Sequence, residues 1–207
     1  IGVTLSAQQA EWAQKAIAEE GLGDLAEVRH SDYRDVHESQ FDAVSSIGLT
    51  EHIGVANYPS YFRFLQSKLR TGGLLLNHCI TRHDNRHGPA AGSFIDRYVF
   101  PDGELEPVAT MIEALEGAGF EIRDVESLRE HYALTLRAWV ANLEGNWADA
   151  VALSSAGRAR VWRLYMAASA LGFMANRLGV NQILAVKCDA RGHSGMPTSR
   201  TDLLQSR

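Results

Sequence analysis

The sequence predicts an α/β fold in which helices flank a mostly parallel sheet. Strand-like runs alternate with helical patterns about every 20 to 30 residues, as in βαβ units. Residues 74–80 form an almost continuous apolar run after two glycines, which is typical of a strand buried on both faces. With 207 residues, 45% of them hydrophobic and 22% charged, the chain has the composition of an ordinary globular domain that needs no disulfide or metal.

The first half of the chain contains most of the expected strands. Residues 1–5 predict a strand, and Ser6 with Gln9 forms a capping-box pattern before a helix that Gly21 and Gly23 end. Further strands are expected over residues 25–30, 41–47 and 74–80, and a helix over 58–69 that Thr71, Gly72 and Gly73 stop.

The second half is richer in helices. Residues 82–92 are polar and predict a long loop, followed by an aromatic segment at 94–100 and a turn at 101–103. Helices are expected over residues 107–115, 132–153 and 155–178, and strands over 120–125 and 180–187. We therefore predict one domain over residues 1–188 and a polar, mobile C-terminal tail over 189–207.

Composition excludes several classes of protein. The net charge of -5 argues against a nucleic-acid binder that depends on phosphate contacts. Cys79 and Cys188 form no C-x-x-C pair, which indicates reduced, cytosolic thiols. The longest apolar stretch, residues 164–175, is well short of the roughly 20 residues that span a bilayer, and no signal peptide is visible. His83 and His87 lie in the polar loop, so we expect no metal site.

Two segments follow predicted strands with side chains suited to a ligand. Thr4 and Gln9 would lie at the carboxyl edge of the sheet, where they could bind a cofactor ribose; the alternative is a helix cap and nothing more. Glu51 and His52 follow the strand at residues 41–47, next to Gly48, and can bind an anion or handle a proton. A helix start with an acidic first turn is the alternative there.

Two further residues and one basic cluster have both a functional and a structural interpretation. His78 ends a buried strand and is either a core histidine or part of a pocket shared with Glu51. Tyr132 begins a long helix and is either an aromatic anchor or a hydrogen-bond donor to an anion. Arginines on the last long helix could contact anionic lipid headgroups, although a solvated helix face is the simpler explanation: Arg158, Arg160, Arg163 and Arg177.

Five motifs, in order, resemble those of the cyclopropane-fatty-acyl-phospholipid synthase family, which includes the mycolic acid cyclopropane synthases. They are GVTLSAQQ from Gly2, SIGLTEHIG from Ser46, LNHCI from Leu76, YVFPDGEL from Tyr98 and HYALTLRAW from His131. The DYRD segment at residues 32–35 also resembles the branch that acts on bacterial phospholipids. The resemblance implies a class I methyltransferase fold with an antiparallel last strand and added helices that form an acyl channel, in which the cofactor sits at the carboxyl edge of the sheet.

The resemblance implies transfer of a methyl group from S-adenosylmethionine to the double bond of an unsaturated fatty acyl chain, most simply of a phospholipid. The resulting carbocation would lose a proton to bound bicarbonate and close a cyclopropane ring; a methyl or methylene branch is the alternative product. The family is cytoplasmic, and both a peripheral contact with the inner membrane face and a homodimer are left open.

The resemblance also implies roles for individual residues. The anion would be held by Glu51, His78, Tyr132 and the backbone of Ile47, the cofactor by Thr4, Gln9 and Gly48, and the acyl channel would be lined by Phe94, Tyr98 and Phe100.

One family feature has no counterpart here. In the family a glycine-rich motif that cradles the methionine part of the cofactor precedes the GVTLS segment, and an upstream cysteine joins the anion site. We therefore expect the chain to be the later part of a longer enzyme, with its first strand missing and two strand edges unpaired. Such a fragment would bind cofactor poorly, and a non-catalytic methyltransferase-like module is the remaining alternative.

Overall fold

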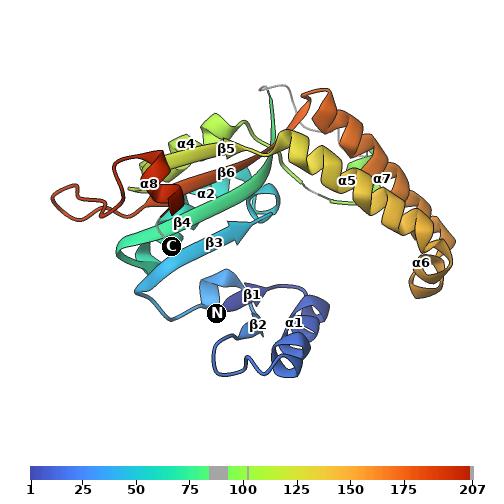
Figure 1. Cartoon of the computed structure of the whole chain (residues 1–207), viewed down its shortest axis with the longest axis horizontal. Helices are drawn as coiled ribbons and strands as arrows, with labels where there is room; N and C mark the ends of the chain where they lie inside the picture. The colour runs from blue at the N-terminus through green and yellow to red at the C-terminus, as the bar shows by residue number, and fades with distance from the viewer. Residues whose placement is uncertain (84–92, 102, 206–207) are drawn as a thin grey trace. The chain divides into compact units, whose positions relative to one another are not determined.

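A computed structural model describes residues 1–83, 93–101 and 103–205 of the chain, so most of the predicted loop at 82–92 lies outside the described residues (Figure 1). The chain divides into two compact units, Ile1–Ser39 and Gln40–Arg207. Each unit is described by itself below.

The first unit is a small parallel pair of strands joined by a helix. Strand β1 (Gly2–Thr4) pairs with β2 (Val28–His30), and α1 (Ala7–Glu19) connects them. The predicted helix start is confirmed, because Oγ of Ser6 accepts a hydrogen bond from the Gln9 amide at 3.3 Å. Strand β2 is shorter than the predicted 25–30, because the amides of Leu25 and Ala26 both donate to the Leu22 carbonyl in a turn. A short 3-10 helix, η1 (Tyr33–Asp35), follows.

The second unit contains a four-stranded sheet in the order β3-β4-β6-β5. Strands β3 (Phe41–Ile47) and β4 (Leu69–Arg82) are parallel. Strand β6 (Leu178–Val186) lies antiparallel between β4 and β5 (Glu121–Ser127), as Figure 1 shows. The prediction of an antiparallel last strand is therefore confirmed.

The strands of the two units belong to separate sheets. Within the described residues, β1 pairs only with β2, and β3 pairs only with β4. One edge of β1 and one edge of β3 are thus without a strand partner in this part of the chain.

One face of the four-stranded sheet is covered by α2 (Tyr58–Lys68) and α4 (Val108–Gly117). Side chains along β4 alternate, so that Leu75 and Cys79 are buried beneath these helices while His78 and Ile80 lie on the other face and are only half-buried. The helices contribute large, fully buried side chains to this core: Tyr58, Tyr61, Phe62, Met111 and Leu115.

The glycines after α2 have a different role from the one predicted. Helix α2 ends at Lys68 and β4 begins at once, so Gly72 and Gly73 lie inside the strand. A Cβ at Gly73 would lie 2.8 Å from the Arg70 carbonyl and 3.0 Å from that of Phe41, where the β3–β4 register shifts. Only glycine fits this close approach, so the pair marks an irregularity in the strand and not a loop.

Three helices extend from one end of the sheet: α5 (Arg129–Gly145), α6 (Trp147–Leu153) and α7 (Ala156–Met174) (Figure 1). The single helix predicted over 132–153 is wrong, because the chain breaks at Asn146. There the Asn146 side-chain amide donates to the Asn142 carbonyl at 2.9 Å, and Gly145 is a poor helix former. Helices α5 and α7 enclose a second core of buried residues: Ala133, Leu136, Met166, Ala170, Phe173 and Val180.

Shorter elements complete the unit. The aromatic segment contains a helical turn, α3 (Phe94–Tyr98), and two 3-10 helices, η2 (Thr50–His52) and η3 (Val55–Asn57), follow β3. The tail, predicted to be mobile, ends in α8 (Arg200–Gln205) and contacts β5 twice. Arg123 donates to the Pro197 carbonyl at 2.9 Å, and Arg200 pairs with Asp124 at 3.1 Å.

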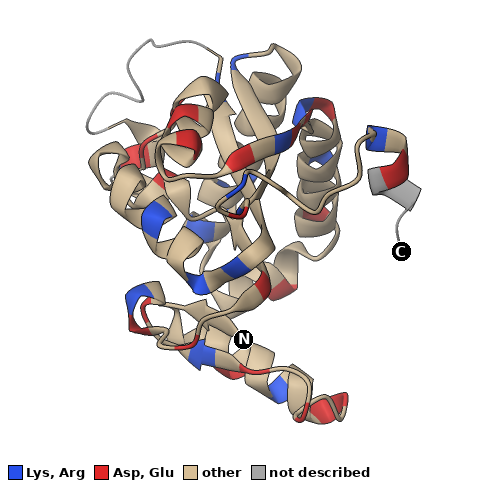
Figure 2. Cartoon of the chain, turned by 90° about the vertical axis from the view of Figure 1, so that its left-hand side faces the viewer, with Lys and Arg blue, Asp and Glu red and all other residues tan. Residues whose placement is uncertain are grey.

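Charges of both signs are spread along the ribbon (Figure 2), which agrees with the mildly acidic composition. Among the described helices, none is long and apolar enough to cross a membrane.

Two leucines of α5 provide a test of the second core. Leu136 is 1% exposed and Leu134 is 62% exposed. We expect Leu136→Ala to lower the free energy of unfolding by about 2 to 5 kcal/mol, because it leaves a cavity between α5 and α7. Leu134→Ala removes the same atoms from the same helix and should change stability by less than about 1 kcal/mol. Urea denaturation followed by circular dichroism measures both; equal losses would contradict this packing.

Candidate functional site

A buried carboxylate lies just beyond the end of β3. Gly48, with φ of 64°, turns the chain out of the strand, and its amide donates to the His78 carbonyl at 2.9 Å. The following turn, η2, places Glu51 in the interior, where it is 6% exposed. Its Oε1 accepts from the Ile80 amide at 2.7 Å and its Oε2 from the Thr50 hydroxyl at 3.3 Å. These bonds offset part of the cost of burying the carboxylate and fix it beside β4.

The Glu51 carboxylate affects the pKa values of two tyrosines, Tyr132 in α5 and Tyr165 in α7. Burial, and then the negative charge of Glu51, raise the pKa of Tyr132. Burial is also the main cause that raises the pKa of Tyr165, with Tyr132 and Glu51 adding to it. Both phenols therefore stay protonated at neutral pH and can donate hydrogen bonds.

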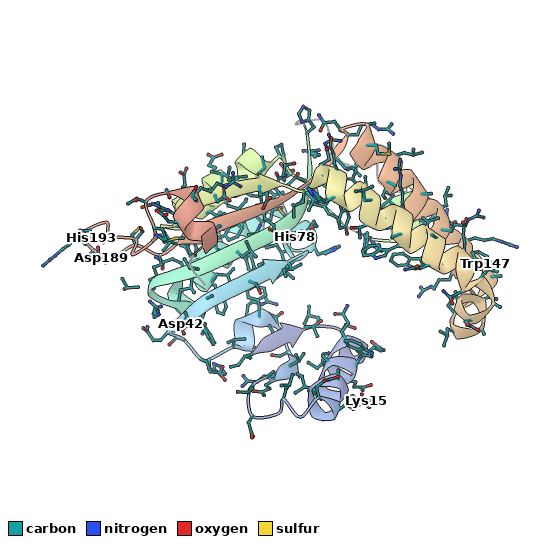
Figure 3. All side chains as sticks on the ribbon, in the orientation of Figure 1. Lys15, Asp42, His78, Trp147, Asp189 and His193 are labelled. Carbon is teal, nitrogen blue, oxygen red and sulfur yellow. The ribbon has the colours of Figure 1, made fainter. Side chains whose placement is uncertain are left out.

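His78 lies at the same end of the sheet. It is the register partner of Ile47 on β3 and of Gln182 on β6, and Figure 3 labels it close to the point where β3 ends. The side-chain amide nitrogen of Gln182 lies 3.2 Å from Nδ1 of His78. The Ile47 side chain is 67% exposed, so any role of this residue at the carboxylate would involve its backbone.

Tyr132 reaches this region from the first turns of α5. The Leu128 amide donates to the Val180 carbonyl at 2.8 Å and so attaches the start of the helix to β6. The Tyr132 ring packs against Phe173 and Trp139, with centroids 5.1 and 6.0 Å away, in a cluster that also includes Ile80. Tyr132 is thus an aromatic anchor and a neighbour of the Glu51 charge at the same time.

The segment after α3 holds the Glu51 turn in place. The Glu104 amide donates to the Glu51 carbonyl at 2.9 Å, and the Glu104 carboxylate accepts from the Val55 amide at 2.8 Å. Arg82 at the end of β4 pairs with Glu106 at 3.2 Å. These bonds join the segment to the two turns after β3 and to the end of β4.

Aromatic rings surround Phe100 at the edge of the same region. Its centroid lies 5.6 Å from Tyr165 and 6.2 Å from Trp162, both in α7, and 5.4 Å from His52. His52 is exposed and packs on Phe100, whereas Glu51 is buried. The two adjacent side chains therefore point into different surroundings and do not form the carboxylate–imidazole pair that the sequence indicated.

These features agree with the comparison of the chain with known families. The model of the family described as mycolic acid cyclopropane synthetase matches residues 1–183. The chain belongs to this family.

Relatives and solved structures support the same assignment. The chain is 61% identical over 197 residues to the probable fatty acid methyltransferase Rv3720 of Mycobacterium tuberculosis, covering 95% of this chain and 46% of the relative. The cyclopropane synthase MmaA2 of M. tuberculosis superposes with a TM-score of 0.81 at 27% identity, covering 89% of this chain and 68% of that one. The mycolic acid cyclopropane synthase CmaA1, complexed with SAH and CTAB, gives 0.79 at 30% identity with the same coverage. The chain thus spans about half the length of the curated relatives it matches.

The family residues expected at the anion site all belong to the second unit. Ile47, Glu51 and His78 lie at the ends of β3 and β4, and Tyr132 joins them through the Ile80 cluster. The three residues expected at the acyl channel lie in two different clusters of aromatic rings. Phe100 joins the aromatic rings of α7, while Phe94 and Tyr98 pack on each other at 5.6 Å within α3 and Tyr98 is 54% exposed.

The residues expected at the cofactor lie in both units. Gly48 belongs to the second, and nothing lies within 4 Å of the place where its Cβ would be. Thr4 and Gln9 belong to the first, where the Thr4 hydroxyl donates to Oε1 of Gln9 at 2.8 Å and accepts from the Ser6 amide. In the DYRD segment, Arg34 pairs with Asp32 and its hydrogen bonds lower the pKa of that carboxyl to about 2.

Three residues of the site escaped the sequence analysis: Glu104, Tyr165 and Gln182. A signal existed for Gln182, because Asn181 and Gln182 are polar residues inside an otherwise apolar strand. No local signal identified Tyr165, since apolar residues are spread around the long helix that carries it and mark no single buried face.

The basic residues predicted to face solvent or lipid headgroups lie at the surface. Arg163 of α7 pairs with Glu144 of α5 at 2.6 Å, and Arg158, Arg160 and Arg177 are exposed. In the part of the chain that the structure describes, no three His, Cys, Asp or Glu residues are arranged to hold a metal, and His87 lies outside that part.

The two cysteines should differ sharply in reactivity. Cys79 is fully buried, and burial together with the Glu51 charge raises the pKa of its thiol to about 12. Cys188 is only partly buried. We expect Ellman's reagent at mildly alkaline pH to modify Cys188 in the native chain and Cys79 only after denaturation. The Cys188→Ser variant is the control: rapid modification of this variant in its native state would show that Cys79 is accessible.

Proposed function

We propose that the enzyme containing this chain transfers a methyl group from S-adenosylmethionine to the double bond of an unsaturated fatty acyl chain and forms a cyclopropane ring. The observation that carries the proposal is the buried Glu51 carboxylate, which is bound to the Ile80 amide of β4, two residues beyond His78, and whose charge acts on Tyr132. Membership of the family supports the same activity.

The chain offers suitable groups for part of the cofactor. When bound, S-adenosylmethionine supplies a methyl group on a positively charged sulfur. Gly48 presents open space where a side chain would stand, so a ligand could approach the backbone there. Thr4 uses only Oε1 of Gln9, and the exposed amide of that residue can donate to a ribose hydroxyl.

The aromatic residues suit the acyl substrate. An alkene is a weak nucleophile, so the reaction requires the double bond to be aligned with the methyl group in a dry environment. Phe100, Trp162 and Tyr165 provide apolar surfaces beside Glu51. As the new C–C bond forms and the C–S bond breaks, positive charge develops on the second alkene carbon, where ring faces and the Glu51 charge stabilise it.

The donor set around Glu51 fits a small anion that carries one proton. Bicarbonate, when bound, supplies a base for the proton that the added methyl group must lose as the ring closes. The Glu51 carboxylate can accept the hydrogen bond of its hydroxyl, while Tyr132 and His78 donate to its other oxygens. The backbone of Ile47, register partner of His78, completes the proposed set.

The proposed substrate is a phospholipid, met by a cytoplasmic enzyme at the inner face of a membrane. Exposed side chains of α6 and α7 support a peripheral contact, because Leu153 and Arg160 combine apolar surface with positive charge. The complex of CmaA1 with SAH and CTAB supports a site for a cofactor and a second ligand in this family.

Lipid analysis tests the activity. We expect cells that express the full-length enzyme to convert oleoyl phospholipids into products heavier by one CH₂ group in mass spectrometry. Proton NMR then separates a cyclopropane, with its upfield ring protons, from a methylene-branched isomer. The absence of any heavier lipid would favour a non-catalytic module.

Glu51→Gln tests the site itself. The variant keeps the size of the side chain but removes the charge, and we expect turnover by the full-length enzyme to fall by about 100-fold or more. Glu113→Gln is the matched control, because Glu113 is exposed on α4. Equal turnover by both variants would remove Glu51 from the mechanism.

Cofactor binding provides a separate test. The 207 residues contain no G-x-G-x-G segment, and close backbone approach to the cofactor depends on such glycines. We expect isothermal titration of the 207-residue chain with S-adenosylmethionine to show no binding in the micromolar range, whereas the full-length enzyme binds. Micromolar binding by the chain alone would contradict the expectation.

A further inference from the structure

Gln182 is a polar residue on an otherwise apolar part of the sheet face. Its neighbours along β6 on this face are Val180 and Leu184, and the residues opposite them on β4 are Ile80 and Leu76. Apolar residues can be buried at these positions without cost, whereas burying an amide costs free energy unless its polar atoms form hydrogen bonds. The partner is His78, which lies directly opposite Gln182 in the antiparallel pair.

The orientation of the Gln182 amide, with its nitrogen toward Nδ1, fits one tautomer of the neutral His78 ring. The Gln182 amide nitrogen lies 3.2 Å from Nδ1, and an NH₂ group can only donate. Nδ1 must therefore accept, which leaves the single proton of the neutral ring on Nε2. The ring then presents an N–H donor on the side away from Gln182.

The placement of the two residues supports a lasting contact. Both side chains are half-buried, and the β4–β6 ladder runs in continuous register from Leu74 to Arg82, so no irregularity separates them. In a partly apolar environment a hydrogen bond is stronger than in water. Ile47, His78, Gln182 and Glu126 form one row across the four strands, with Gln182 between His78 and the exposed Glu126.

We propose that Gln182 is a positioning residue that holds His78 in the Nε2–H tautomer, so that the ring donates a hydrogen bond to the anion beside Glu51. This inference rests on the proposed function, because the anion is part of it. A ring with its proton on Nδ1 would present a lone pair to the anion and repel it.

Gln182→Glu tests the inference with almost no change in shape. A carboxylate can only accept, so Nδ1 must take the proton and the neutral ring loses its Nε2–H. Spectra and turnover are recorded at alkaline pH, where the ring is neutral, because the imidazolium that a carboxylate favours would keep both N–H groups. Gln182→Met is the matched control, since it has similar bulk, cannot donate and accepts only weakly. The readout is the two-bond ¹⁵N–¹H NMR pattern of the full-length enzyme labelled in histidine, with the His78 signals assigned from a His78→Gln variant.

We expect Nε2–H in the wild type, Nδ1–H in Gln182→Glu, and both tautomers in Gln182→Met. Turnover should decrease in the order wild type, Gln182→Met, Gln182→Glu, and the last variant should lose about 10- to 100-fold, as is typical when the partner that orients a functional histidine is changed. The KM for lipid should not change, because Gln182 does not contact the acyl chain in this scheme.

The outcomes separate the inference from the proposed function. An Nδ1–H tautomer in the wild type, or a Gln182→Glu variant no slower than Gln182→Met, overturns the role of Gln182. Full activity of His78→Gln would overturn the role of His78 in the proposed function, whatever the tautomer. A reversed tautomer with the expected loss of turnover supports both.

Discussion

The hydrogen bond between the Ile80 amide and the Glu51 carboxylate connects the turn after β3 to the body of β4, and the candidate site depends on it. A carboxylate that is 6% exposed is costly unless it is hydrogen-bonded, so the turn can keep this conformation only while β4 offers that amide. The same bond sets the position from which the Glu51 charge acts on Tyr132 and Tyr165. The Ile80 amide of β4 therefore fixes the carboxylate whose charge reaches Tyr132 in α5 and Tyr165 in α7.

The fold was largely predictable because its signals are local. The strand over Phe41–Ile47 matched its prediction to the residue, and the antiparallel last strand followed from the family resemblance. The errors came from competing local interactions. Gly72 and Gly73 suggested a stop but relieve a close approach inside β4, and the amide of Asn146 divided one predicted helix into two.

The site was less predictable, because its geometry depends on contacts between distant segments. The motifs predicted roles for Glu51, His78 and Tyr132. The adjacent Glu51 and His52 have different surroundings, because the His52 ring packs on Phe100 from a segment far along the chain. Gln182 is 104 residues from His78 in sequence and meets it only through the β4–β6 register. No spacing rule in a single sequence provides that register.

The alternation of β4 explains how one strand can serve both packing and chemistry. Leu75 and Cys79 point toward α2 and α4 and are fully buried. His78 and Ile80, on either side of Cys79 in sequence, point to the opposite face. The core face resists change because its side chains are fully buried under α2 and α4. On the other face His78 is only half-buried and makes the Gln182 contact. A rigid packed face beneath His78 therefore holds its backbone, and a single cross-strand amide needs only to orient its ring.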